Sequence, residues 1–205
     1  MKISMIGDKT TPLHNRGFTL VEVLVALSIF SIVITIASDF FISFQRTQRA
    51  TEALQGVSSS ARQVMERIVA EVAEHQVDYA SYPSATAPLP AQSLVLKDDE
   101  GNRIFFRQED SEICPDAAGS PCAAMSLNGE EWSALTPRGV RVRALNFYIS
   151  PSRDPFFFDT ATNAYAADAQ PIVTVVLDME GDGIPGASQS RVTLQTAVES
   201  RVYKR

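Results

Sequence analysis

The sequence predicts an α+β protein in which one long N-terminal helix packs on an antiparallel β-sheet. An uninterrupted apolar run occupies residues 18–44, and apolar residues then recur in steps of three and four up to residue 79. Beyond Pro90 the pattern changes to short alternating runs, which are typical of strands. A length of 205 residues allows one ordinary globular domain and an additional element.

The apolar run, Phe18 to Phe44, contains no Pro, Gly, Lys or Arg. As a helix its 27 residues would be about 40 Å long, whereas a bilayer core needs only about 20 apolar residues. Residues 1–17, which precede it, carry three basic side chains and one acidic side chain. Because basic flanks stay in the cytoplasm, we expect a transmembrane helix at 18–44 with the following chain outside.

A secretory signal peptide would have a small-residue cleavage site after its apolar core. Here Gly17 stands before the apolar run, so cleavage at this point would remove residues 1–17 as a leader and keep the helix. Glu22 lies inside the run, where an unpaired carboxylate costs free energy. Its natural partner is a cation at similar depth, such as a free amine on Phe18 of a neighbouring chain. The alternative is a plain signal anchor.

The segment RGFTLVEVLVALSIFSIVI resembles the class III signal of type IV prepilins and type II secretion pseudopilins, and the match covers residues 15–45. The resemblance implies a pilin-like fold. It also implies that a membrane prepilin peptidase cuts after Gly17 and N-methylates Phe18, and that Glu22 is the assembly carboxylate. Many major pilins have a helix-bending Pro in the neighbourhood where this sequence has Asp39.

The helical pattern continues as an amphipathic segment at 45–80. Its apolar positions recur with the period of a helix, so we expect them to form one buried face. These positions are Leu54, Val57, Ala61, Val64, Ile68, Val72, His75 and Tyr79. The helix is predicted to span residues 18–79 and to end before Pro83, Pro88 and Pro90, which cannot continue it.

The head, residues 81–205, is predicted to be rich in β-strands. Two runs separated by a turn, at 93–98 and 103–108, predict a hairpin. Further strands are expected at 140–149, 171–179 and 191–204. The natural arrangement packs this antiparallel sheet against the apolar face of the helix.

Three segments of the head, LTPRGVRVRALNFYI, PIVTVVL and LQTAVESR, are similar to the J-type minor pseudopilins and related minor pilins. The similarity covers scattered strand positions and contains no chemical motif. A generic pilin-like domain is therefore the alternative at this point.

The two cysteines, Cys114 and Cys122, lie in a short segment rich in Pro, Gly and Ala. Without a histidine cluster they make a poor zinc site. Outside the cytoplasm they would form a local disulfide, whereas in a reducing compartment they would stay free thiols. The basic leader favours the disulfide because it places the head outside.

Asp178, Glu180 and Asp182 stand at alternate positions beside two glycines in the segment 178–183. Carboxylates spaced in this way can bind Ca²⁺ through their oxygens. A complete EF-hand loop needs a closing Glu, and Gln189 stands at that position. The alternatives are an acidic turn and a weak calcium site, and we expect no cofactor.

The residues that carry catalysis in other proteins do not form a constellation in this sequence. His14 belongs to the leader, so a catalytic triad would rest on His75 alone. Ser58, Ser59 and Ser60 lie on the predicted helix and show no nucleophile elbow. We therefore expect that the chain is not an enzyme.

The net charge of −6 predicts no nucleic-acid footprint. Loss of the leader, with its three basic residues and one acidic residue, would change the net side-chain charge to −8. The densest basic group is Arg138, Arg141 and Arg143. Because it lies in a strand-like pattern, a solvated sheet face is favoured over a ligand patch.

The leading functional hypothesis is a minor pilin or pseudopilin that is processed by a prepilin peptidase and assembled with other subunits. It would sit in the inner membrane as a single-pass protein and enter a type IV pilus or type II secretion pseudopilus. A bulky head hinders dense packing, which favours a position at the tip or in initiation. The alternative is an adhesin or DNA-uptake pilin that binds a ligand through loops 109–139 and 150–170. The run of three Phe residues in 155–159 is either an exposed patch or buried under a loop.

Overall fold

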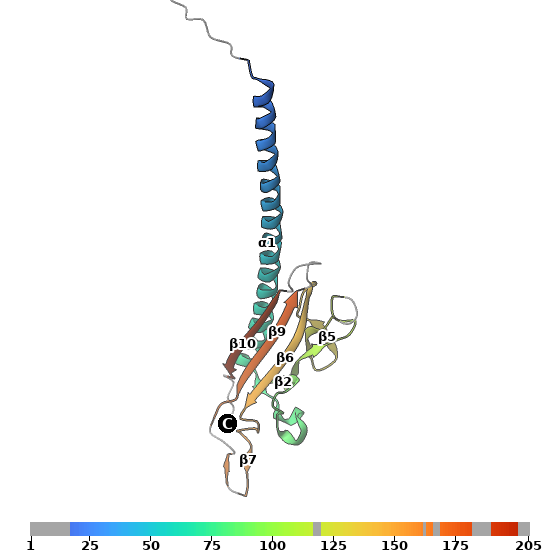
Figure 1. Cartoon of the computed structure of the whole chain (residues 1–205). Coiled ribbons are helices and arrows are strands. Elements are labelled where there is room, and N and C mark those ends of the chain that lie inside the picture. Colours follow the sequence, from blue (N-terminus) through green and yellow to red (C-terminus); the bar gives the residue numbers. More distant parts are fainter. Residues whose placement is uncertain (1–16, 117–119, 162, 166–168, 182–189, 201–205) are drawn as a thin grey trace, which may run out of the picture. The chain divides into compact units, whose positions relative to one another are not determined.

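The structure is a computed structural model that describes residues 17–116, 120–161, 163–165, 169–181 and 190–200 (Figure 1). Its contacts divide the chain into two compact units, 1–45 and 46–205. The long helix α1, Leu20–Glu74, begins in the first unit and ends in the second. The other described elements are β1 Gln76–Val77, the 3-10 helices η1 Tyr79–Ser81 and η2 Pro83–Ala85, β2 Ser93–Lys97, β3 Arg103–Glu109, β4 Cys122–Leu127, β5 Glu131–Ala134, β6 Val140–Ser150, β7 Phe158–Asp159, β8 Ala164–Tyr165, β9 Ile172–Gly181 and β10 Arg191–Glu199.

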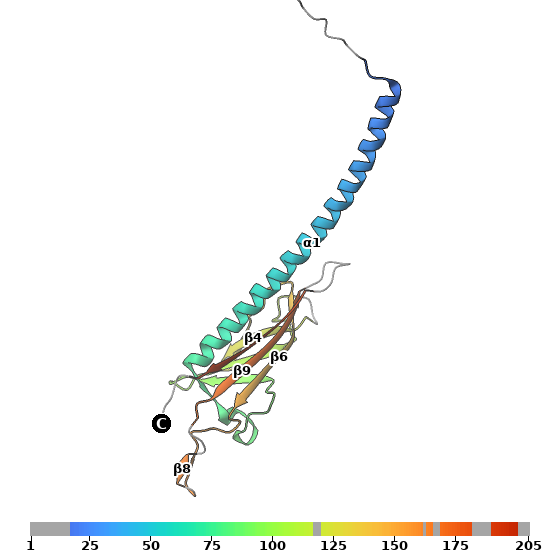
Figure 2. The same cartoon turned by 60° about the vertical axis from the view of Figure 1, so that its left-hand side comes forward.

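The strands of the second unit form antiparallel sheets, as the α+β prediction requires. The larger sheet has the order β1-β2-β3-β4-β5, and a second sheet has the order β10-β9-β6. The short strands β7 and β8 form a separate hairpin. Within this unit, the C-terminal half of α1 runs alongside the sheets (Figure 2). The fold class is confirmed, with two main sheets where the sequence suggested one.

The predicted buried face of α1 packs into the core of the second unit. Five of its residues have exposed fractions of 2% or less: Val57, Ala61, Val64, Ile68 and Val72. They share one apolar cluster with inward side chains of β2, β3, β6 and β9. Each large apolar side chain buried here contributes roughly 1.5–3 kcal/mol. Leu54 is 45% exposed, so the prediction is wrong at that position and burial begins one turn later.

The helix ends five residues earlier than its apolar pattern predicts. The His75 amide makes a last bond to the carbonyl of Glu71, and the backbone then pairs as β1 with β2. Tyr79, the last predicted helical position, lies in η1, and its hydroxyl donates to the carbonyl of Pro151 at 2.8 Å. Strand pairing therefore takes the backbone groups that another helical turn would have used.

The five predicted strands are all present, and the hairpin at 93–108 is the β2–β3 pair. Its turn is held by Asp98, whose carboxylate accepts hydrogen bonds from the amides of Glu100 and Asn102. The residues predicted as strand beyond 200 lie outside the described residues. Strands β4 and β5 were not predicted because CAAMSL and EWSA are poor in the β-branched residues that signal a strand.

At Gly181, the end of β9 approaches α1 closely. A methyl group added at this glycine would lie 2.7 Å from Cγ2 of Val57, closer than any real contact. Valine has a stiff χ1 angle and cannot turn away easily. The glycine therefore sets the distance at which the helix packs on this strand.

We predict that Gly181→Ala lowers the free energy of unfolding by about 1–3 kcal/mol, the usual cost of overpacking. Thermal unfolding of the full chain in detergent, followed by Trp132 fluorescence, measures the loss. The double variant Gly181→Ala/Val57→Ala should lose less unfolding free energy than the sum of the losses in the two single variants, because removing the valine methyl groups makes room for the new one. Gly56→Ala is the control, since nothing lies within 4 Å of that position, and it should stabilise the helix by about 0.5–1 kcal/mol. An unchanged midpoint for Gly181→Ala would contradict the close approach.

Candidate functional site

The start of α1 coincides with the predicted processing site. Gly17 has no neighbouring atom within 4 Å of the position of a Cβ, and Phe18 is 81% exposed. The helix begins at Leu20, directly after Thr19. The hydroxyl of Thr19 accepts a hydrogen bond from the amide of Glu22 at 3.2 Å. Thr19 therefore caps the helix, and cleavage after Gly17 would leave the cap intact.

Thr19 was not singled out from the sequence, although the signal was available. Thr-Leu-Val-Glu matches the capping-box pattern, with Thr at the N-cap and Glu three residues later. Glu22 thus lies in the first turn of α1, where the helix dipole favours a negative charge. This local role stands beside the proposed assembly role, and an experiment on Glu22 has to separate the two.

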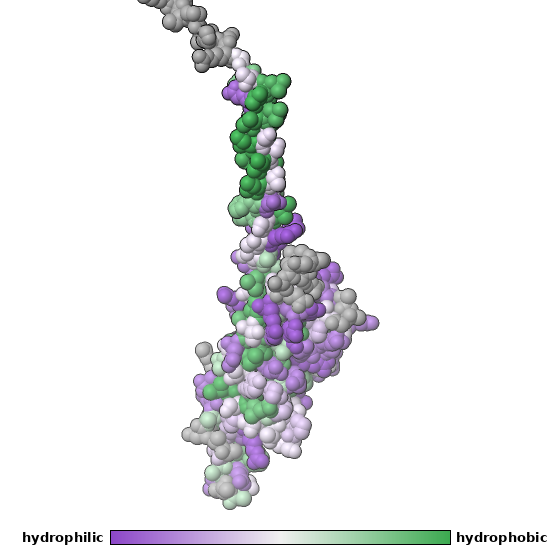
Figure 3. Space-filling view, in the orientation of Figure 1, coloured by the Kyte–Doolittle hydropathy of each residue, from purple (hydrophilic) through white to green (hydrophobic). Residues whose placement is uncertain are grey.

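The apolar part of α1 is long and apolar enough to cross a membrane. Its large side chains are exposed from Leu20 to Phe44, with Leu24 at 59%, Phe30 at 61% and Ile36 at 64%. Figure 3 shows these apolar side chains gathered along the N-terminal half of the helix. An apolar surface of this length requires a membrane or other subunits to cover it.

The polar residues inside the apolar part do not interrupt the helix. Four hydroxyl groups donate to carbonyls four residues earlier, at 2.8–2.9 Å: those of Ser28, Ser31, Thr35 and Ser38. A donor satisfied in this way is tolerated in an apolar medium. The helix also continues through Asp39, where many major pilins have the bending Pro.

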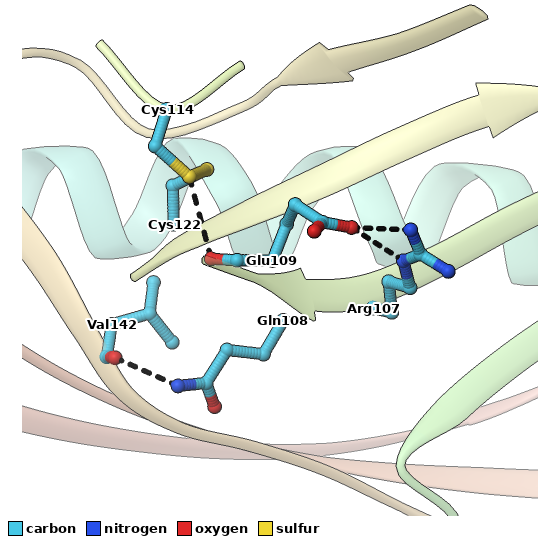
Figure 4. Close-up of a disulfide and its surroundings, with 6 residues drawn as sticks. All are labelled: Arg107, Gln108, Glu109, Cys114, Cys122 and Val142. Carbon is cyan, nitrogen blue, oxygen red and sulfur yellow. Dashed lines mark hydrogen bonds and ion pairs between the residues drawn. A yellow bond between two sulfur atoms is a disulfide. The ribbon is translucent and has the colours of Figure 1, made fainter. Parts of the chain in front are cut away.

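The structure contains the disulfide between Cys114 and Cys122 (Figure 4). Cys122 opens β4 opposite Glu109, the last residue of β3, so the bond ties Cys114 to one end of this strand pair in the larger sheet. The two sheets meet at Val142 of β6. Its amide donates to the carbonyl of Pro121 at 2.7 Å, and its carbonyl accepts from Gln108 Nε2 at 3.1 Å. The disulfide therefore supports the junction between the sheets.

Asp178 and Glu180 lie within β9, so the expectation of an acidic turn is wrong for these two residues. Asp182 lies outside the described residues. The alternation of the strand points Leu177 and Met179 into the core and places both carboxylates on the opposite face. They are nevertheless only 7% and 2% exposed.

Arginines from the neighbouring strands cover the two carboxylates. Glu180 accepts from Arg143 Nη1 at 2.8 Å and also pairs with Arg141, both from β6. Asp178 accepts from Arg191 Nε of β10 at 2.9 Å. As calcium ligands the carboxylates would have to give up these ion pairs. Their partners could not be predicted from the sequence, because only the pairing of the strands brings Arg141 and Arg191 close to them.

The arginine hydrogen bonds lower the pKa of both carboxyl groups. The bond from Arg143 is the main cause for the pKa of Glu180, and the bond from Arg191 is the main cause for the pKa of Asp178. A depressed pKa in the folded state means that the ionised form is stabilised by folding. The cluster of Arg141, Arg143, Arg191, Asp178 and Glu180 thus holds three strands together on the outer face of the small sheet.

The residues considered for catalysis remain apart. Ser60 donates to the carbonyl of Gly56 within the helix. His75 Nδ1 lies 2.9 Å from the carbonyl of Glu71 and 3.3 Å from its carboxylate. His14 lies outside the described residues. In the described part of the chain, no group of His, Cys, Asp and Glu side chains is placed to hold a metal ion.

The fold and the N-terminal segment together define a protein with one apolar helix that continues into an α+β head. Residues 13–38 match the prokaryotic N-terminal methylation motif, and this match identifies a class III signal of the prepilin and pseudopilin family. No curated protein and no solved structure matches the chain. The motif supports a pilin or pseudopilin that is processed by a prepilin peptidase, and it suggests a structural subunit.

We predict that the ion pairs of Asp178 and Glu180 make stability depend on pH in the acid range. Their contribution is fully present above the ordinary pKa values of about 3.9 and 4.3. It is lost as the pH falls through the lowered pKa values of the folded state. Unfolding midpoints measured from pH 6 to pH 2 should therefore fall less steeply in Glu180→Gln than in the unmodified chain. Glu131→Gln, at an exposed position of β5, is the control and should keep the original slope.

Proposed function

We propose that this chain is a minor pilin or pseudopilin subunit, placed at the tip of the filament or used in its initiation. The observation that carries the proposal is the methylation motif at residues 13–38. The motif includes the capped start of α1 and much of its exposed apolar part. In this proposal residues 1–17 are the leader, 18–44 the membrane span, 45–80 the amphipathic continuation and 81–205 the head.

Processing is proposed to occur between Gly17 and Phe18. The three basic residues of the leader favour the cytoplasmic side for the cleavage and the outside for the head. Gly17 leaves the peptide open to a protease because it has no side chain and no close neighbour. The new amine on Phe18 would then be N-methylated, and a methylated amine keeps its positive charge at neutral pH.

Glu22 is proposed to pair with the Phe18 amine of an adjacent subunit. Glu22 takes part in none of the ion pairs formed by the residues that the structure describes. The cost for an acid is about 3 kcal/mol near the centre of a membrane helix and less near its ends. Pairing in the apolar interior of a filament would remove this cost and fix the axial register between neighbours.

The position at the tip rests on the size of the head. The second unit holds both main sheets, the β7–β8 hairpin and the disulfide segment on a single helix. A head of this bulk favours incorporation in few copies. The strand segments that resemble J-type minor pseudopilins support the same role. Partners would be other pilin or pseudopilin subunits and the prepilin peptidase, in the inner membrane.

We predict that the membrane-extracted protein begins at Phe18 and carries one added methyl group. Intact mass and N-terminal sequencing test this directly. Gly17→Val should leave the leader attached, whereas the same change at Gly7, the other glycine of the leader, should allow cleavage. A protein that begins at Met1, or after residue 40, would contradict the proposed processing.

We predict that Glu22→Gln inserts, is cleaved and folds, but no longer co-purifies with its partner subunits and reduces the number of filaments. Gln keeps the capping-box pattern and removes only the charge, so a loss isolates the electrostatic role. Glu22→Val should behave in the same way.

Thr19→Ala is the matched control for Glu22. It removes the helix cap, at a usual cost of about 1 kcal/mol, and keeps the carboxylate. Assembly should therefore persist in Thr19→Ala. If Glu22→Gln recovers partner subunits as well as the unmodified chain does, the carboxylate has no role in assembly.

A further inference from the structure

A cleft of about 680 Å³ lies in the second unit beside the segment that follows α1. One wall comes from η1 and η2, with Tyr79 and Ser84, and the other comes from residues within 153–159 and from Tyr165. Small-molecule sites in proteins occupy about 300–1,000 Å³ and combine apolar walls with a few polar groups. The size and lining of this cleft meet that description.

Aromatic rings supply the apolar part of the cleft. Phe157 is 64% exposed and Tyr165 is 48% exposed, although both are large apolar side chains of a folded unit. The Tyr165 ring is held edge to face against Phe158, with centroids 5.3 Å apart. Phe157 comes from the three-Phe run that the sequence singled out. These two rings therefore offer accessible surfaces to a ligand.

Charged groups of both signs converge on the same cleft. Oδ1 of Asp154 accepts from the amide of Phe156, and Oδ1 of Asp159 accepts from the amide of Ala161, each at 2.8 Å. These bonds orient the carboxylates and leave acceptor capacity on each. Arg153 also lines the cleft, and its guanidinium takes part in none of the ion pairs among the residues that the structure describes.

The wall formed by η2 is a strained turn. Ser84 and Ala85 have φ angles of 57° and 52°, a left-handed conformation that residues other than glycine adopt at a cost. The Ala85 amide donates to the carbonyl of Tyr82 at 3.0 Å and holds the turn in place. Strain of this kind clusters at ligand sites, where the surrounding structure maintains it. Both residues line the cleft.

We propose that this cleft binds a neutral oligosaccharide. A sugar ring presents an apolar C–H face, which fits Phe157 and Tyr165, and hydroxyl groups, which can donate to Asp154 and Asp159 and accept from Arg153. An anionic ligand would meet two carboxylates, and a cationic ligand would meet the guanidinium. A ligand that is uncharged and rich in hydroxyls satisfies all of these groups. This binding function goes beyond filament assembly and uses none of its residues.

The test uses the full processed chain in a detergent without a sugar headgroup. Cellotetraose, chitotetraose and maltotetraose are the probes, measured by saturation-transfer NMR and by calorimetry. At least one should bind. Phe157→Ala and Asp154→Asn should each weaken its affinity by about tenfold or more, the effect of losing one contact of about 1.4 kcal/mol. Tyr148→Ala removes another exposed aromatic ring, on β6 outside the cleft, and should leave the affinity unchanged.

Unfolding midpoints of the variants establish that the head is intact; both changed side chains are at least partly exposed, so the fold should persist. Absence of binding by all three sugars would overturn the proposal, as would binding that Phe157→Ala leaves unchanged. Binding of tetralysine that is lost in Asp154→Asn and kept in Arg153→Gln would assign the cleft to a basic peptide. Phe157→Ala should assemble normally, so this test and the Glu22 test can fail independently.

Discussion

One uninterrupted helix backbone has to serve two different environments in this protein. An α-helix can do so because its backbone hydrogen bonds are made within the segment, whether lipid, protein or water surrounds it. In the first unit the side chains of α1 are exposed and apolar, and Ser28 and its three hydroxyl neighbours bond back to the helix. From Val57 onward a single face is buried. Thr19 caps the start, and the pairing of β1 with β2 ends the helix.

The packing of α1 against the small sheet determines which side chains of β9 face the core and which face outward. The close approach of Gly181 to Val57 brings β9 against the helix. The period of two along β9 then turns Leu177 and Met179 inward and leaves Asp178 and Glu180 on the other face. Carboxylates in the middle of a small sheet are stable there because arginines of both neighbouring strands cover and neutralise them. The same contact that buries the apolar face thereby creates the need for the ion-pair cluster.

The two proposed activities use different parts of the chain. The proposed processing and assembly would use Gly17, Phe18 and Glu22 at or just before the start of α1, whereas the proposed sugar cleft is built from residues after the helix ends. The proposed assembly would use the apolar surface of α1 and the charge of Glu22, which suit a membrane and the interior of a filament. The cleft is lined by aromatic rings and by charged groups of both signs, which suit a ligand dissolved in water. A subunit carried in few copies at the tip would present such a cleft without interfering with the packing of the shaft.

The sequence by itself determined the helix, its apolar and amphipathic parts, and the processing motif, because each depends on residues close together along the chain. The five main strands also followed from local patterns of apolar residues, and the disulfide partners are only eight residues apart. Only the tertiary structure decided that the helix stops at Glu74, since its competitor for the backbone is a strand some twenty residues later. It alone joined Glu180 to Arg141, 39 residues away, and the Tyr79 hydroxyl to the carbonyl of Pro151. Such partners depend on how the sheets pack, and no local pattern of residues predicts them.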